Sequence, residues 1–134
     1  MTEEERNLEA VKHWLHFYNT DVKRMIQECY AENAKVHDMG YMVMKDHPRF
    51  LAVEEAVLRV APSRQARIEH TLAKDNVVVV EATLFGKDKD SGEAWEMPWC
   101  AVLTFKDGKI ITDRTYMDHL KLQTAFPFQR QEKA

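Results

Sequence analysis

Apolar residues recur every three or four positions through the N-terminal part of the chain, which is the spacing of amphipathic helices. Thr2 followed by Glu5 resembles a capping box, and the stripe behind it predicts a helix over about residues 3–18. A polar break follows, in which Thr20 or Asp21 can cap a second helix. The apolar stripe of that second helix is formed by Val22, Met25, Ile26, Cys29 and Tyr30.

The second helix is predicted to lead into a strand that starts around Val36, with Asp38 near its beginning. His47 and Pro48 then start a third helix, because proline is tolerated in a first helical turn, and Pro62 ends it. The predicted buried face of this third helix comprises Phe50, Leu51, Val53, Val57, Leu58 and Val60.

Beyond Pro62 the period changes to two-residue alternation, with β-branched and aromatic residues enriched. This pattern predicts strands over residues 68–72, 77–85, 94–105 and 109–117. Three helices followed by such strands predict an α+β domain, in which a curved antiparallel sheet wraps around the three N-terminal helices as a cone. Part of the concave face is then expected to form an apolar pocket with a few polar groups.

The composition agrees with one compact unit. The chain has 134 residues, of which 45% are hydrophobic, so a single domain over residues 1–134 can enclose one core, with a loosely ordered tail at 127–134. The net charge of −3, without a stripe of Lys or Arg, argues against nucleic acid as a partner. We expect a cytoplasmic protein without a membrane partner, because no apolar run reaches the roughly 20 residues of a membrane span and the N-terminus lacks a signal-peptide pattern.

No pattern in the sequence predicts a metal ion or a cofactor. Cys29 and Cys100 lack the spacing of a metal site and are expected to be reduced and buried. The six histidines show no ligand motif, and no glycine-rich phosphate loop occurs. We therefore expect no metal and no cofactor.

Asp38 is the most informative single residue, because it is a lone carboxylate in an apolar stretch that includes Val36, Met39 and Tyr41. A lone acid in such surroundings is a candidate general base. Three other interpretations stay open: a solvated carboxylate at a strand start, a helix cap, and a group that orients a ligand.

His70 shares a strand face with Ile68 and Leu72 if the strand alternates regularly. It is then either a hydrogen-bonded core histidine or, on a concave face, a donor to a substrate oxygen or a group that tunes Asp38.

Several other side chains have structural interpretations. Glu81 and Thr83 are predicted to face outward, although a change of register by one residue would turn them to the pocket. Asp118 follows the last strand and can cap the next turn. The apolar run at residues 77–80 favours a homodimer through the outer face of the sheet. The large apolar side chains expected in the core or in such an interface are Met42, Met44, Trp95, Met97, Trp99 and Phe126.

Three segments together resemble the nuclear transport factor 2-like superfamily. They are VKHWLHFYN at residues 11–19, YAENAKVHDMG at residues 30–40, and the ending FKDGKI to RTYMD at residues 105–118. The superfamily includes ketosteroid isomerases, SnoaL-like polyketide cyclases and limonene-epoxide hydrolases. The resemblance extends over about residues 5–125 and implies the cone-shaped fold, while one such fold hosts many chemistries.

The resemblance to ketosteroid isomerases places Asp38 where those enzymes keep the aspartate that moves a proton next to a carbonyl. Their two oxyanion donors, a tyrosine and a protonated aspartate, correspond here to Trp14 and to Cys100 or the neighbouring Ala101. The indole N–H of Trp14 can donate a hydrogen bond. Further candidate donors are Tyr18, Tyr41 and Trp99.

The cyclases and the hydrolases carry an acid/base aspartate on their last strand, at the position that Thr115 occupies here. Residues 81–83 replace the arginine and aspartate of the hydrolases' middle strand. Asp113 shares a strand face with Thr115 and Met117, so the resemblance implies that it points inward as a second acidic candidate.

Together these patterns predict a cofactor-free acid/base enzyme that moves a proton next to the carbonyl of a small apolar compound, giving isomerisation or cyclisation. The candidate catalytic residues are Asp38, His70 and Asp113. The candidate substrate-binding residues are Trp14, Tyr18, Tyr41, Trp99, Cys100, Thr115 and Met117. The alternatives are an epoxide hydrolase, a non-catalytic binder of an apolar molecule, and an interaction domain whose cone is filled by its own side chains.

Overall fold

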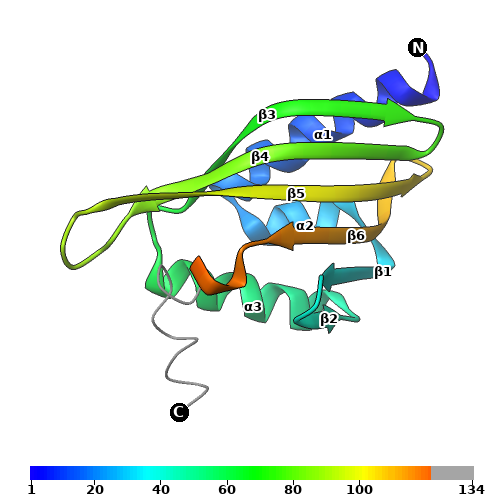
Figure 1. Cartoon of the computed structure of the whole chain (residues 1–134). Coiled ribbons are helices and arrows are strands. Elements are labelled where there is room, and N and C mark those ends of the chain that lie inside the picture. The colour runs from blue at the N-terminus through cyan, green and yellow to red at the C-terminus, as the bar shows by residue number, and fades with distance from the viewer. Residues whose placement is uncertain (122–134) are drawn as a thin grey trace.

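The computed structural model describes residues 1–121, which form a layer of helices against one six-stranded sheet (Figure 1). In chain order the elements are α1 (Glu3–Thr20), α2 (Val22–Cys29), β1 (Tyr30–Asp38), β2 (Met42–Met44), α3 (His47–Val60), β3 (Gln65–Lys74), β4 (Val77–Lys87), β5 (Ala94–Lys106) and β6 (Lys109–Met117). Phe126 and the predicted loose tail lie outside the described residues.

The first two helices begin at predicted caps. The Oγ1 atom of Thr2 accepts a hydrogen bond from the backbone N–H of Glu5 at 3.1 Å. Asp21 caps α2 in the same way, accepting from the N–H of Arg24 at 3.1 Å, while α1 extends through Thr20. A cap of this kind stabilises a helix by about 1 kcal/mol.

β1 begins earlier than the sequence predicted, which corrects two expectations. Tyr30 has extended backbone angles (φ −107°, ψ 136°) and opens β1, so it does not belong to the stripe of α2. Asp38 lies at the end of the strand and not near its start. Buried Ala34 and Val36 alternate with exposed polar residues, and this polar content hid the two-residue period of the strand.

α3 begins at His47 as predicted, with Asp46 accepting a hydrogen bond from the N–H of Arg49 at 2.8 Å. Of its predicted buried face only Phe50 is fully buried, and the other five members are half-buried. The reason is that α3 packs on α2, β1 and β2 while its inner face borders a cavity.

The sheet is curved and has the strand order β2-β1-β6-β5-β4-β3 (Figure 1). All neighbouring strands are antiparallel except β1 and β6, which are parallel and depart from the predicted antiparallel pattern. This pair is parallel because the chain leaves β1, builds α3 and the β3–β5 meander, and returns beside β1 in the same direction. α1 packs on β3 and β4, and α2 packs on β1 and β6. The predicted α+β cone is confirmed.

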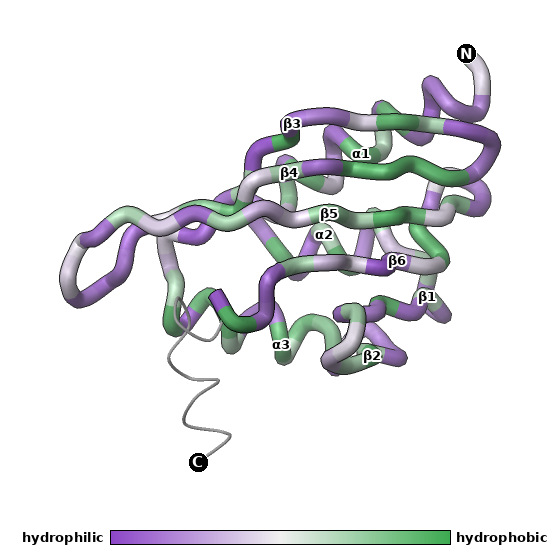
Figure 2. Tube along the Cα trace, in the orientation of Figure 1, coloured by the Kyte–Doolittle hydropathy of each residue, from purple (hydrophilic) through white to green (hydrophobic). Residues whose placement is uncertain are grey.

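Alternation along the central strands places the core on the concave face of the sheet. The inward residues of β4 and β5 are Val78, Val80, Ala82, Leu84, Met97, Trp99, Ala101, Leu103 and Phe105. The apolar stretches of these two strands run beside each other in Figure 2. Glu81 and Thr83 face outward, as predicted, and the side chain of Thr83 donates to Glu69 at 3.0 Å. Within residues 1–121 no helix is long and apolar enough to cross a membrane.

Candidate functional site

A cavity of about 300 Å³ lies between α3, the end of β1 and the concave face of β5 and β6. Its aromatic lining residues are Trp14, Tyr18, Tyr30, Tyr41, Phe50 and Trp99. Its ionisable and hydroxyl-bearing lining residues include Asp38, Glu54, Arg64, Asp113 and Thr115. The fold therefore brings three carboxyl groups, from β1, α3 and β6, to one largely apolar space.

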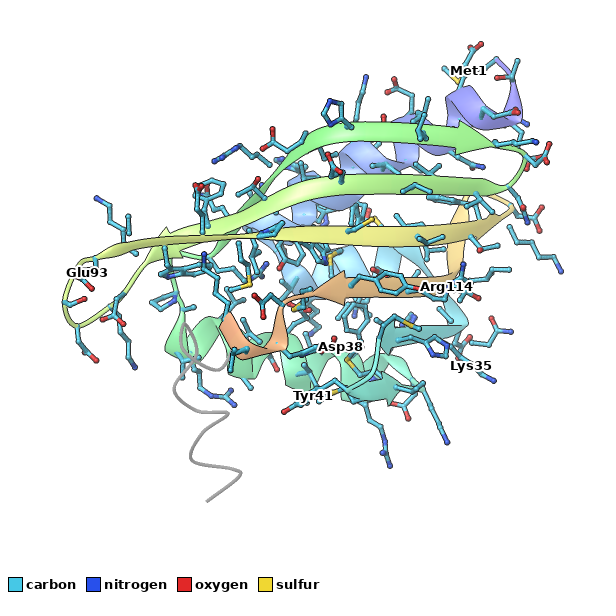
Figure 3. The ribbon with its side chains drawn as sticks, in the orientation of Figure 1. Met1, Lys35, Asp38, Tyr41, Glu93 and Arg114 are labelled. Atoms are coloured by element: carbon cyan, nitrogen blue, oxygen red, sulfur yellow. The ribbon has the colours of Figure 1, made fainter. Side chains whose placement is uncertain are left out.

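The parallel pairing of β1 with β6 fixes the position of Asp38. Asp38 lies opposite Thr115 in the register, and the N–H of Met39 donates to the Thr115 carbonyl at 3.0 Å. The chain then turns, with the N–H of Tyr41 donating to the Asp38 carbonyl at 2.9 Å. Gly40 supplies the positive φ of 77° that this turn needs. Figure 3 shows Asp38 and Tyr41 near each other where β1 ends.

His119 is the ionisable neighbour of Asp38. Its Nε2 atom lies 3.1 Å from Oδ1 of Asp38, and its ring stacks on Tyr41 with centroids 5.0 Å apart. The side chains of Asp38 and His119 are only 17% and 25% exposed. Burial raises the pKa of Asp38, the His119 charge lowers it, and the Asp113 charge raises it. Asp38 is therefore a partly desolvated carboxyl group at the edge of the cavity.

Asp113 is the centre of a buried hydrogen-bond network and is itself 3% exposed. Tyr30 donates its O–H to Oδ2 of Asp113 at 2.6 Å, and Thr115 donates to Oδ1 at 2.7 Å. The indole N–H of Trp14 donates to the Tyr30 oxygen at 2.9 Å. Burial raises the pKa of Asp113, while the hydrogen bonds from Tyr30 and Thr115 lower it. The network links α1, β1 and β6 beneath the cavity.

Two predicted site residues lie away from the cavity. The side chain of His70 is 80% exposed on the outer face, where its Nδ1 atom lies 2.9 Å from Glu81, so the expectation of a core or concave position is wrong. A register shift between Ile68 and His70 interrupts the regular alternation on which that expectation rested. Cys100 also faces outward, because its neighbours Trp99 and Ala101 take the buried positions of β5.

The other predicted site residues border the cavity: Trp14, Tyr18, Asp38, Tyr41, Trp99, Asp113, Thr115 and Met117. Trp14 does not offer its N–H directly to the cavity, because that group donates to Tyr30. Asp118 accepts hydrogen bonds from the backbone N–H groups of Leu120 and Lys121, as predicted for a turn cap. Cys29 is buried, Cys100 is half-buried, and both are free thiols. In the described part of the chain no group of three acidic, His or Cys side chains could hold a metal ion.

Sequence reasoning missed five polar side chains at or beside the cavity, namely Tyr30, His37, Glu54, Arg64 and His119. Glu54 had a signal, since it lies four residues after Phe50 and three before Val57, which is the buried stripe of α3. Tyr30 was hidden in the apolar stripe assigned to α2. Arg64 and His119 lie outside the predicted helices and strands, where periodicity carries no information about side-chain direction.

Comparison with known proteins identifies the family. The model of the SnoaL-like domain matches residues 11–112, and the chain belongs to this family. The predicted relationship to the nuclear transport factor 2-like superfamily is thereby confirmed. A search of curated proteins found no match.

Solved structures agree with the fold. A protein from Jannaschia sp. CCS1 described as a SnoaL-like polyketide cyclase has a TM-score of 0.83 at 19% identity, with 94% of each chain covered. A Catenulispora acidiphila protein with a ketosteroid isomerase-like fold, in complex with trimethylamine, has a TM-score of 0.77 at 14% identity, covering 89% of this chain and 92% of that one. A limonene-epoxide-hydrolase-like (LEH-like) enzyme from M. tuberculosis has a TM-score of 0.75 at 16% identity, covering 94% and 88%. At these identities the likeness establishes the fold alone.

Proposed function

We propose that the protein is a cofactor-free acid/base enzyme that moves a proton next to the carbonyl of a small apolar compound, giving isomerisation or cyclisation. The observation that carries the proposal is the pairing of two different carboxyl environments in one apolar cavity. Asp38 sits at the edge beside His119, and Asp113 is buried beneath with Tyr30. Carboxyl groups whose surroundings differ in this way can take different acid/base roles.

Asp38 acts as the base in this proposal. Burial raises its pKa, which brings the carboxylate closer in proton affinity to the carbon acid that it must deprotonate. The apolar walls hold the substrate beside it, and Asp38 then returns the proton at another carbon. The His119 charge opposes this rise and favours the carboxylate form of Asp38.

Tyr30 is the proposed donor to the enolate oxygen. It accepts the N–H of Trp14, and its hydroxyl group touches Asp113 at 2.6 Å. Burial favours the neutral form of Asp113, which can donate its proton to the Tyr30 oxygen and free the phenolic O–H to point at the substrate. A donor of this type contributes about 2.7–4 kcal/mol to transition-state stabilisation. Trp14 then acts through Tyr30, and His70 has no part.

The test measures exchange of α-hydrogen for deuterium in a panel of enolisable apolar ketones by NMR. Asp38→Asn is expected to slow exchange by about a hundredfold or more, the usual contribution of a general base, while binding of a planar phenol stays unchanged. Asp107→Asn is the matched control, because Asp107 is an exposed turn residue whose φ of 52° asparagine tolerates. Exchange that persists in Asp38→Asn would reject the proposal, and binding without exchange of any ketone would indicate a carrier.

Epoxide hydrolysis is the second candidate. The paired Glu54 and Arg64 side chains add a third carboxyl group and a cation to the cavity, and such groups can activate water and stabilise an alkoxide. The LEH-like epoxide hydrolase shares the fold. Incorporation of ¹⁸O from labelled water into a diol product would distinguish this reaction from isomerisation.

A further inference from the structure

Arg64 combines complete burial with unmatched hydrogen-bond donors. It lies between α3 and β3, its side chain is 0% exposed, and it borders the cavity. Arginine is almost never fully buried unless it is paired, because a buried charge must find acceptors. The atoms around this side chain therefore indicate which acceptors the protein itself supplies.

The described residues 1–121 supply only part of the hydrogen-bond acceptors that the guanidinium group needs. Nη2 donates to the backbone carbonyl of Tyr18 at 3.3 Å, and the group lies over the Tyr18 ring with Cζ 3.7 Å from the ring centroid. Nε and Nη1 have no hydrogen-bond partner within residues 1–121. Because Nε carries one N–H and Nη1 carries two, these N–H groups need acceptors from elsewhere.

Glu54 is paired with Arg64 but is a weak partner. Its Oε2 atom lies 3.7 Å from Nη2, which is beyond hydrogen-bond distance. Burial raises the pKa of Glu54, Arg64 lowers it, and the charges of Asp113 and Asp38 raise it further. Glu54 therefore holds its proton more strongly than an exposed glutamate does, and it makes no hydrogen bond to the guanidinium group.

We propose that Arg64 is a second recognition point for the substrate and binds a neutral oxygen of a ketone, ester or hydroxyl group. This inference rests on the proposed function, because the oxygen is distinct from the carbonyl beside which Asp38 acts. A neutral acceptor fits better than a carboxylate, since the Asp38 carboxylate that the proposed function requires borders the cavity and would repel another anion. The substrate class is then a largely apolar molecule with two separate oxygen functions.

The experiment compares planar phenols that differ in one group. The probes are 2-naphthols that carry an acetyl, an ethyl or a carboxylate group at position 6 or 7, titrated by fluorescence. The acetyl probe with the matching spacing is expected to bind roughly tenfold or more tightly than its ethyl counterpart, as a hydrogen bond to a charged donor implies. Arg64→Met should abolish this preference and leave ethyl-probe binding in place.

Arg67→Met is the matched control. Arg67 follows Arg64 closely in the sequence, but its side chain is 52% exposed in β3 and does not border the cavity. Circular dichroism checks that Arg64→Met folds. If it does not fold, Arg64→Lys, which keeps the charge but has fewer donors and no planar fork, should reduce the acetyl preference.

The inference is overturned if acetyl and ethyl probes bind wild-type protein equally at both positions, if the preference survives Arg64→Met, or if the carboxylate probe binds most tightly. Repeating the titration with Asp38→Asn separates the two proposals. An acetyl preference that persists there supports Arg64 as a recognition point even if deuterium exchange shows that Asp38 is not the base. Absence of binding by every probe would overturn both.

Discussion

The surroundings of Asp38 move its proton affinity in opposite directions. Burial and the Asp113 charge raise its pKa, and His119, 3.1 Å away, lowers it. The stacking of His119 on Tyr41 holds the imidazole at that distance. The proton affinity of the candidate base is therefore set by burial, by Asp113 of β6 and by His119 beyond β6, which stacks on Tyr41 of the β1–β2 turn.

Replacement of His119 tests this account. In His119→Gln the pKa of Asp38 is expected to rise, because the charge that favours the carboxylate is removed. In Asp113→Asn no fall is expected if Asp113 is neutral as proposed, whereas an ionised Asp113 would repel the Asp38 carboxylate and its loss would lower the Asp38 pKa. Carboxyl-carbon NMR of labelled protein measures the Asp38 pKa in both variants, with Asp38→Asn used to assign the signal. His16→Gln, an exposed position on α1, is the control. An unchanged Asp38 titration in His119→Gln would contradict the role of the contact.

Tyr30 links secondary-structure elements that are distant in sequence. It opens β1, accepts a hydrogen bond from Trp14 of α1 and donates one to Asp113 of β6. Its ring also packs edge-on against Phe50 of α3 at 4.9 Å between centroids. One side chain thus fixes how the helices lie on the parallel strand pair that carries Asp38 and Asp113.

Tyr30→Phe removes the hydroxyl group and keeps the ring packing. The buried Trp14 N–H and one oxygen of Asp113 then lose their partner, so we expect the free energy of unfolding to fall by about 1–3 kcal/mol. Urea denaturation measures the change. Tyr116→Phe on β6, where the residue is 45% exposed, should change it little. Equal effects of the two substitutions would show that the network adds no stability beyond the ring.

Within residues 1–121, burial raises the pKa of three carboxyl groups, namely Asp38, Glu54 and Asp113. A folded-state pKa above the unfolded value means that the folded protein binds more protons. The extra protons stabilise the folded state fully below the pKa that these carboxyl groups have in the unfolded chain, about 4. This stabilisation is lost as the pH rises through their pKa values in the folded protein.

We therefore expect the free energy of unfolding, from urea titrations, to fall between about pH 4 and the folded pKa values of these groups. Glu54→Gln cannot ionise and should make this decline shallower. Glu55→Gln, the exposed neighbour on α3, should leave it unchanged. A profile that rises over this range, or one that Glu54→Gln does not flatten, would contradict the assigned direction of the pKa changes.

Helices and strands whose apolar residues recur at a regular spacing were predictable from the sequence, and elements without such a spacing were not. α1 begins where its capping residue indicated, α3 begins where Pro48 indicated, and β4, β5 and β6 follow their two-residue alternation. β1 was mostly missed, because its exposed side chains are polar and its buried ones few. His70 was misplaced because a register shift in β3 breaks the alternation that predicted its face.

The sequence by itself determined the order and type of most elements and the cone-shaped class of the fold, because local periodicity carries that information. It also marked Asp38 as a lone acid in an apolar stretch, while Asp113 became a candidate through the resemblance to the superfamily. Only the tertiary structure decided which side chains meet. The parallel return of β6 beside β1 brings Asp113 to Tyr30, and the segments that follow α3 and β6 place Arg64 and His119. These contacts join residues many positions apart, and such distances are fixed by packing of whole elements and not by any local pattern.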